Sequence, residues 1–271
     1  MIKLLYKSLG KKNKLFANNF IIFLIKNNII NISFLPANFR NYISGEMVFN
    51  YKKSLKKDSR GFYYVYPQFK SSDLDHYYES LYWTQFRSDN QVSINQRDIE
   101  QYNLIIKNTG DFFMSKKRTF VNFGSGHGGV SFLFYYNGHN VINIDPDKNV
   151  FNSIDLDKNR WIKLSSINDL NSQIDFFYSS HSLEHVADID DFLAILNKKL
   201  TKKKSTYLFF EVPDGDHEFN GGKSGKIMTP HTYYFTTKFF EKLSIENCYT
   251  QKEYRVIRYL GRYENDEIEI R

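Results

Sequence analysis

FGSGHGG, residues 123–129, joins the apolar run 120–123 to an apolar helical pattern over 129–136. Glycine lets the backbone turn sharply and leaves no Cβ between the backbone and a ligand. The spacing fits both Gly-x-Gly-x-Gly and Gly-x-Gly-x-x-Gly. Taken alone, the stretch therefore predicts a strand, a tight turn and a helix, and a turn with a purely structural role stays open.

Asp145 follows the next apolar run, 141–144, about 20 residues after the glycine turn. A carboxylate at the end of a second strand can accept hydrogen bonds from both hydroxyls of a ribose. Together, the glycine turn and Asp145 indicate a cofactor that contains adenosine.

Short apolar runs alternate with helical patterns through the rest of this region. The runs at 120–123, 141–144, 161–164, 174–178 and 206–212 read as strands, and 129–136 and 188–200 read as helices. Apolar strands that alternate with helices predict an α/β fold, in which a doubly wound, mainly parallel sheet carries helices on both faces. Ligands of such sheets bind beyond the carboxyl ends of the strands.

The N-terminal part of the chain has a different composition. Residues 1–60 hold ten Lys and two Arg against Glu46 and Asp58, whereas the remainder is slightly acidic. We therefore divide the chain into a basic extension (1–60), a lead-in and cofactor-lid region (61–115) and the α/β domain (116–271). A solvated tail is the favoured interpretation of the extension, and docking onto anionic lipid, polysaccharide or nucleic acid stays open.

The extension is not expected to span a membrane. Lys26, Asn27 and Asn28 interrupt its apolar run over 15–35, which falls short of about 18 uninterrupted apolar residues. An amphipathic helix is expected instead, packed on the domain or peripheral at the inner membrane surface.

The single cysteine, Cys248, excludes an internal disulfide and a Cys-rich zinc site. We therefore expect a reducing, cytoplasmic setting and no metal.

Five blocks follow one another along the chain: VNFGSGHGG (121–129), VINIDPD (141–147), IDFFYSSHSLEHVADIDDFLAILNKKL (174–200), YLFFEVPD (207–214) and PHTYYFTTKFFEKL (230–243). Together they resemble the class I S-adenosylmethionine-dependent methyltransferases, which implies a Rossmann-like fold and S-adenosylmethionine as the cofactor. The most specific block contains Ser-His-Ser-Leu-Glu-His-Val (180–186) and Asp188, and it is similar to the small-molecule branch of that family.

The resemblance also implies which residues contact the cofactor. They are Asn122, Gly124, Ser125, Gly126, Gly128, Asp145, Pro146, Ser180 and His181. Relatives usually carry an acidic residue at the position of Asn122, near the methionine amino group. An amide oxygen still accepts a hydrogen bond from an ammonium group, although the contact is weaker without a full charge.

The segment 61–83 is similar to the lead-in of bacterial methyltransferases that modify surface polysaccharides and sugars. This similarity implies that the acceptor is a small molecule or a surface-glycan precursor and that the reaction is O-methylation of a sugar. The zinc-ribbon cysteines that often precede the lead-in are absent. Aromatic residues of this segment are expected to cover the cofactor or to pack in the core: Tyr77, Tyr78, Tyr82 and Trp83.

Three histidines in the resembling blocks are candidates for the base that a sugar hydroxyl requires. His181 is the first choice, because it lies just beyond the predicted strand at 174–178, at the cofactor edge of the sheet. His231 is the alternate, and His185 either contributes to catalysis or orients the helix that follows it. A nucleic-acid methyltransferase and a catalytically silent subunit with the same fold stay open as alternatives, while the block around Glu184 and His185 disfavours a nicotinamide oxidoreductase.

Overall fold

The computed structural model describes residues 54–81, 93–147, 155–200, 205–219, 231–243, 245–253, 255–263 and 268. The chain divides into two compact units, one formed by 1–52 and 72–87 and the other by 53–71 and 88–271. Helix α4 (Ser71–His76) and the π-helical turn η2 (Tyr77–Leu81) fall almost entirely in the first unit. The division at residues 60 and 115 stays a prediction.

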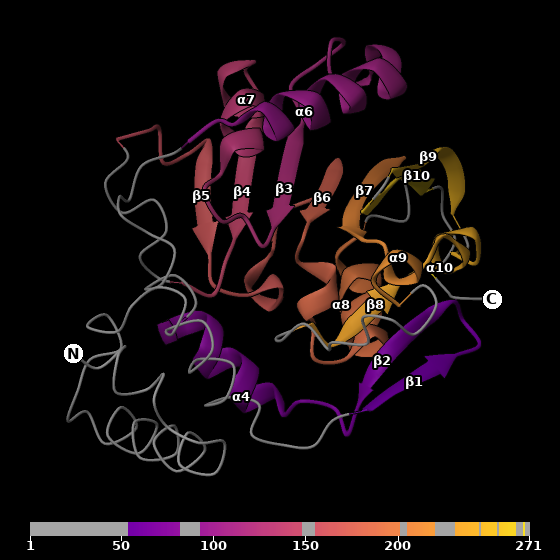
Figure 1. Cartoon of the computed structure of the whole chain (residues 1–271). Helices are drawn as coiled ribbons and strands as arrows, with labels where there is room; N and C mark the ends of the chain where they lie inside the picture. Colours follow the sequence, from indigo (N-terminus) through magenta and orange to yellow (C-terminus); the bar gives the residue numbers. More distant parts are fainter. Residues whose placement is uncertain are drawn as a thin grey trace, which may run out of the picture. The chain divides into compact units, whose positions relative to one another are not determined.

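A seven-stranded sheet forms the centre of the second unit, and its strand order is β5-β4-β3-β6-β7-β10-β9 (Figure 1). The first five strands are parallel, and β10 and β9 continue the sheet in antiparallel fashion. The predicted Rossmann-like, mainly parallel sheet is confirmed. The strands are β3 (Thr119–Phe123), β4 (Asn140–Ile144), β5 (Trp161–Leu164), β6 (Phe176–Ser180), β7 (Thr206–Pro213), β9 (Glu246–Glu253) and β10 (Val256–Tyr263).

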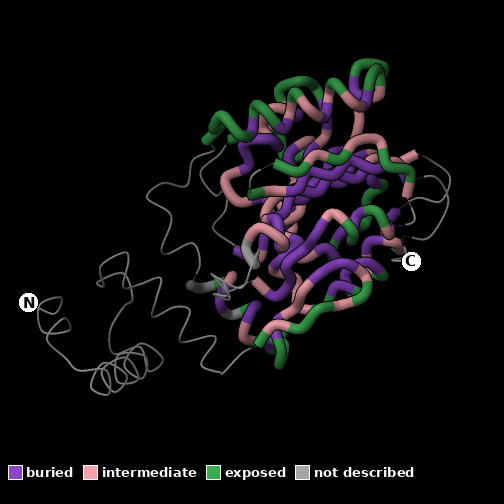
Figure 2. Tube along the Cα trace, turned by 45° about the vertical axis from the view of Figure 1, so that its right-hand side comes forward, coloured by how far each residue is buried: buried purple, intermediate pink, exposed green. Residues whose placement is uncertain are grey.

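Helices cover both faces of this sheet, because alternate strand residues point to opposite sides. On one face, Phe120 packs with residues of α6 (Gln96–Thr109) and α7 (Gly129–Tyr136). On the other, Val121 packs with residues of α8 (Ile189–Lys199) and α10 (Thr237–Glu241). Figure 2 shows the strands buried between these layers. Short elements complete the unit: η3 (Gly110–Phe112), η4 (Ile167–Asp169), η5 (Leu183–His185) and α9 (Gly215–Phe219).

A second, antiparallel sheet has the order β1-β2-β8, with β1 (Ser54–Asp58), β2 (Phe62–Tyr66) and β8 (Tyr233–Phe235). β2 covers the aromatic start of the lead-in segment. Val65 donates its amide hydrogen to the carbonyl of Thr232, and Phe62 packs against Phe235. These contacts hold the start of β8 in place. They also position His231, one of the predicted histidines, which directly precedes Thr232.

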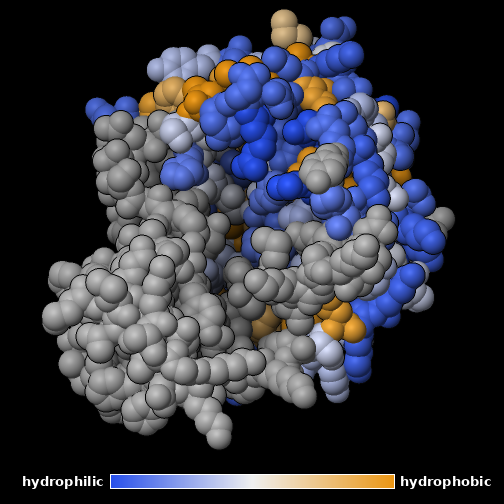
Figure 3. Space-filling model, in the orientation of Figure 1, coloured by the Kyte–Doolittle hydropathy of each residue, from blue (hydrophilic) through white to orange (hydrophobic). Residues whose placement is uncertain are grey.

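The predictions for residues 1–53, for Tyr82 and for Trp83 fall outside the described residues. Tyr77 and Tyr78 lie in η2, and their role as a cofactor lid stays a prediction. Within the described ranges, none of the helices combines the length and the apolar composition that a bilayer crossing requires. Figure 3 shows a described surface that is mostly hydrophilic, with apolar side chains gathered over the region of α6 and α7.

Candidate functional site

The glycine turn connects β3 to α7 at the carboxyl edge of the parallel strands. Three glycines have positive φ values that residues other than glycine rarely adopt: Gly124 at 70°, Gly126 at 49° and Gly128 at 67°. A Cβ on Gly124 would also collide with the hydroxyl of Ser182, which follows β6. The turn therefore has to be glycine-rich, and it lies directly against the end of the neighbouring strand.

Asp145 ties this turn to the end of β4. Its Oδ2 accepts a hydrogen bond from the amide of Gly126 at 2.9 Å, and its Oδ1 accepts one from Asp147 at 3.0 Å. A carboxylate offers about four acceptor positions, so these two bonds are compatible with further bonds to a ribose. Pro146, also predicted as a contact, is half-buried between the two acidic residues. The contacts of Asp145 and Pro146 with the cofactor stay predictions.

We expect Asp145→Ala to weaken the binding of S-adenosylhomocysteine by about 1.5–3 kcal/mol, because the variant loses hydrogen bonds to a charged acceptor. The structure adds a second reason, since the amide of Gly126 loses the partner that fixes the turn. Titration calorimetry measures the change. Asp145→Asn should lose less, because its amide oxygen can still accept a hydrogen bond; wild-type affinity in both variants would contradict the assignment.

Asn122 belongs to a buried polar group beneath the glycine turn. Its Nδ2 donates to Ser131 Oγ at 2.8 Å, and that hydroxyl donates to Asn143 Oδ1 at 2.6 Å. Among the described residues, Asn122 Oδ1 and Ser125 Oγ are buried and have no hydrogen-bond partner. A buried polar atom without a partner costs about 1–3 kcal/mol. These atoms fit a ligand that donates hydrogen bonds, such as the ammonium group of S-adenosylmethionine.

Glu211 on β7 is the centre of a buried hydrogen-bonded network that the sequence did not reveal. The residue is fully buried, and it accepts hydrogen bonds from Arg258 Nε at 2.6 Å and from Ser180 Oγ at 3.1 Å. Burial opposes ionisation, but His181 and Arg258 outweigh it and lower the pKa of Glu211 to about 2. The hydroxyl of Ser180 also accepts from Gln101 Nε2 at 3.0 Å. Ser180 thus supports Glu211, and its contact with the cofactor stays a prediction.

His181 lies between two buried carboxylates. Its Nδ1 is 3.5 Å from Glu184 Oε1, and its Nε2 is 3.3 Å from Glu211 Oε1. Its φ of 50° is in the left-handed region, so its backbone holds a conformation that is uncommon for histidine. Burial opposes protonation, but Glu184 and Glu211 outweigh it and raise the pKa of His181 to about 9. The raised pKa favours the imidazolium, whereas a general base has to be neutral; the base role of His181 stays a prediction.

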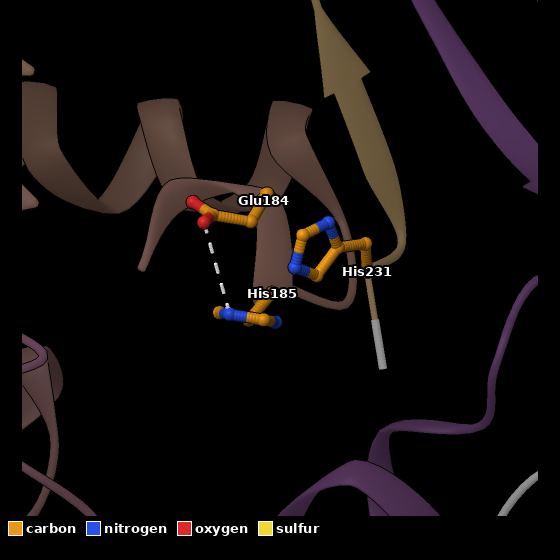
Figure 4. A group of neighbouring side chains, drawn as sticks. All are labelled: Glu184, His185 and His231. Carbon is orange, nitrogen blue, oxygen red and sulfur yellow. Dashed lines mark ion pairs between the residues drawn. The ribbon is translucent and has the colours of Figure 1, made fainter. Parts of the chain in front are cut away.

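Glu184, His185 and His231 converge at the same edge, from two segments that are distant in the sequence (Figure 4). Glu184 and His185 belong to η5, and His231 lies two residues before the start of β8. The amide of Thr232 donates to the carbonyl of Glu184 at 2.8 Å, which fixes the two segments to each other. His185 Nε2 is 3.8 Å from Glu184 Oε1, and the two imidazole rings are 4.8 Å apart.

Electrostatics gives the members of this group different charges. Burial disfavours the charge on Glu184, but His185 and His181 outweigh it and lower the pKa of Glu184 to about 2. Burial and the neighbouring His185 lower the pKa of His231 to about 4, so His231 is neutral near pH 7. The structure therefore gathers all three predicted histidines around one buried carboxylate. Sequence reasoning used Glu184 as part of a motif and missed it as a site residue.

Comparison with known proteins adds a family match. A family model described as a methyltransferase domain matches residues 82–255. None of the curated proteins matches. Similar solved structures include magnesium protoporphyrin IX methyltransferase from Synechocystis PCC 6803 with bound S-adenosylhomocysteine (13% identity, TM-score 0.49, covering 72% of this chain and 100% of that one). Another is an S-adenosylmethionine-dependent methyltransferase from Mesorhizobium loti (12% identity, TM-score 0.45, covering 60% and 96%).

Proposed function

This chain belongs to the family of class I S-adenosylmethionine-dependent methyltransferases, and on that premise we propose that it methylates a hydroxyl oxygen of a small molecule or saccharide. The cofactor is S-adenosylmethionine, whose sulfonium already activates the methyl group. The main task of the enzyme is then to hold the acceptor oxygen in line with the methyl carbon. Glycine-turn residues and Asp145 hold the cofactor in this proposal, with Asn122 facing its ammonium group.

The convergence of Glu184, His185 and His231 is the observation that carries the choice of an oxygen acceptor. A hydroxyl must lose its proton before or during attack on the methyl carbon, so its site needs groups that assist this loss. Oxygen and nitrogen atoms of all three side chains lie within 4.8 Å of one another. The group also lies close to the glycine turn, because Ser182 next to η5 donates a hydrogen bond to the carbonyl of Gly124 at 3.4 Å.

His181 has a positioning role in this proposal, in place of the base role first expected for it. Its ring bridges Glu184 and Glu211, so it holds the acceptor-side carboxylate at a fixed place relative to β7. His185 and His231, rather than His181, assist the acceptor hydroxyl in losing its proton. The proposal keeps the cytoplasmic setting, and residues 1–60 remain the segment available for contact with an anionic membrane.

Calorimetry with S-adenosylmethionine, S-adenosylhomocysteine and NAD in parallel tests the cofactor, and a methylation screen tests the acceptor. The screen compares nucleotide-activated sugars with oligonucleotides, using radiolabelled methyl donor. We expect binding of the first two ligands and methylation of a sugar hydroxyl. Binding of NAD alone would contradict the cofactor, and exclusive methylation of oligonucleotides or of a nitrogen or carbon atom would contradict the proposed acceptor. A chain that binds donor but methylates nothing would point to a silent subunit.

A further inference from the structure

We propose that Glu184, His185 and His231 form a binding site for a divalent transition-metal ion of the zinc type. The binding itself follows from these side chains alone. The part of the inference that concerns the reaction rests on the proposed function, because it assigns the ion to the acceptor hydroxyl. No metal motif is visible in the sequence, since the ligands come from two separate segments, and this site departs from the sequence-based expectation of a metal-free protein.

The donor atoms suit such an ion in kind and in number. Two imidazoles and one carboxylate are the ligand set of many open zinc sites, in which water or substrate takes the fourth position. Nε2 of His185 is 3.8 Å from Oε1 of Glu184, and the ligand atoms of all three residues lie within 4.8 Å. A tetrahedral ion with bonds of about 2.1 Å needs donors about 3.4 Å apart. Side-chain movements that shorten the donor separations by up to about 1.4 Å would bring them to this spacing.

Burial gives an independent reason to expect a ligand here. Glu184 is 1% exposed, and among the described residues neither of its oxygens has a hydrogen-bond partner. The buried Nδ1 of His231 has no hydrogen-bond partner there either. Buried polar atoms nearly always have partners in native proteins, and an ion is one of the groups that supplies them. Oε1 of Glu184 is within ion-pair distance of His181 and His185, but among the described residues Oε2 of Glu184 and Nδ1 of His231 have no hydrogen-bond partner, and an ion is one ligand that the two side chains could share.

The surroundings of the group also suit a metal. Ligands in metal sites are held by a second layer of polar contacts. His181 supplies such a contact, because its Nδ1 is 3.5 Å from Glu184 Oε1 while its Nε2 faces Glu211. The backbone bond from Thr232 to Glu184 fixes the distance between the two ligand segments. His185 has a side chain that is 16% exposed, so an acceptor can approach the group from its side.

An ion held by one carboxylate and two neutral imidazoles keeps a net positive charge and acts as a Lewis acid. An acceptor hydroxyl in the fourth position would release its proton to solvent, and its oxygen would attack the methyl carbon of S-adenosylmethionine. The carbon–sulfur bond breaks, and the electron pair stays on the sulfur of S-adenosylhomocysteine. The products are a methyl ether, S-adenosylhomocysteine and one proton.

Zinc titration of the full chain tests the site without any acceptor. The protein is stripped with a chelator, dialysed and titrated with ZnCl2 against a chromophoric competitor, and Co²⁺ absorption reports tetrahedral coordination. We expect one equivalent of Zn²⁺ per chain and at least tenfold weaker binding in His185→Ala, His231→Ala and Glu184→Gln. His217→Ala is the matched control, because His217 lies on α9 outside the group. Its Zn²⁺ affinity should equal that of the wild type.

His231→Gln serves as a second, conservative variant if His231→Ala fails to fold, and circular dichroism verifies both. The metal site is wrong if the wild type binds Zn²⁺ no better than the ligand variants, and the role of the ion in the reaction is wrong if the stripped protein methylates its acceptor at the full rate. Affinity for S-adenosylhomocysteine and methyl transfer are measured on the same samples. Zinc binding without methylation of any hydroxyl would contradict the proposed function and support the metal site. Hydroxyl methylation without zinc binding would support the proposed function and contradict the metal site.

Discussion

Glu184→Gln should lower turnover by about 10²–10⁴-fold, the range expected when assistance to proton removal is lost. Glutamine keeps the volume of the buried side chain but removes the charge that faces His181 and His185 at 3.5 and 3.8 Å. Affinity for S-adenosylhomocysteine should stay unchanged, because the glycine turn and Asp145 are untouched. Single-turnover methyl transfer and calorimetry on the same protein separate the two effects.

Glu241→Gln is the matched control, since Glu241 is an exposed glutamate at the end of α10. Its turnover should equal that of the wild type. Full activity of Glu184→Gln with the true acceptor would show that the group of Glu184, His185 and His231 does not assist the reaction. Loss of cofactor binding would instead place Glu184 in the cofactor pocket.

Arg258→Ala should destabilise the fold by about 3–5 kcal/mol, because it leaves a buried carboxylate without its strongest partner. Arg258 Nε is 2.6 Å from Oε2 of Glu211, and Glu211 is fully buried. Denaturant unfolding followed by circular dichroism measures the free energy. The double variant Arg258→Met with Glu211→Gln should lose less than the sum of the two single variants, since no charge is then stranded.

The same pair predicts a pH dependence. The pKa of Glu211 is about 2 in the fold against an ordinary 4.5. Its ionisation therefore stabilises the protein above about pH 4.5, and this contribution disappears as the pH falls toward 2. The difference in stability between wild type and Arg258→Ala should shrink over that interval. The role assigned to the pair would be contradicted if Arg258→Ala lowered the free energy of unfolding by less than about 1 kcal/mol at pH 7. It would also be contradicted if the difference in this free energy between wild type and variant did not change with pH.

The local pattern of glycines and apolar residues was sufficient to predict much of the parallel sheet. The helix predicted at 129–136 and the strand predicted at 161–164 have the predicted bounds. Glycines and apolar periodicity fix such elements through neighbours in the chain. The fourth strand was expected at 174–178 and lies at Phe176–Ser180, because Ser179 and Ser180 resemble a turn in the sequence but are held inside the sheet. Inside the sheet, the hydroxyl of Ser180 donates a hydrogen bond to Glu211.

The antiparallel end of the sheet was not predicted. The burial pattern of β9 is almost entirely that of an exposed edge strand, so its residues carry too weak an apolar signal to mark a strand. β10 then supplies Arg258 directly opposite Glu211 in the register with β7. This pairing joins residues that no local rule connects.

By itself, the sequence determined the glycine turn, Asp145, the alternation of strands and helices, and the three histidines as candidates, because these signals depend on residues close together in the chain. The tertiary structure alone decided what each histidine faces. His181 became a bridge between two carboxylates, and His185 and His231 met at Glu184. The physical reason is that charge, burial and ligand geometry at this edge arise from contacts between η5, β7 and the start of β8, whose positions only the packed sheets fix.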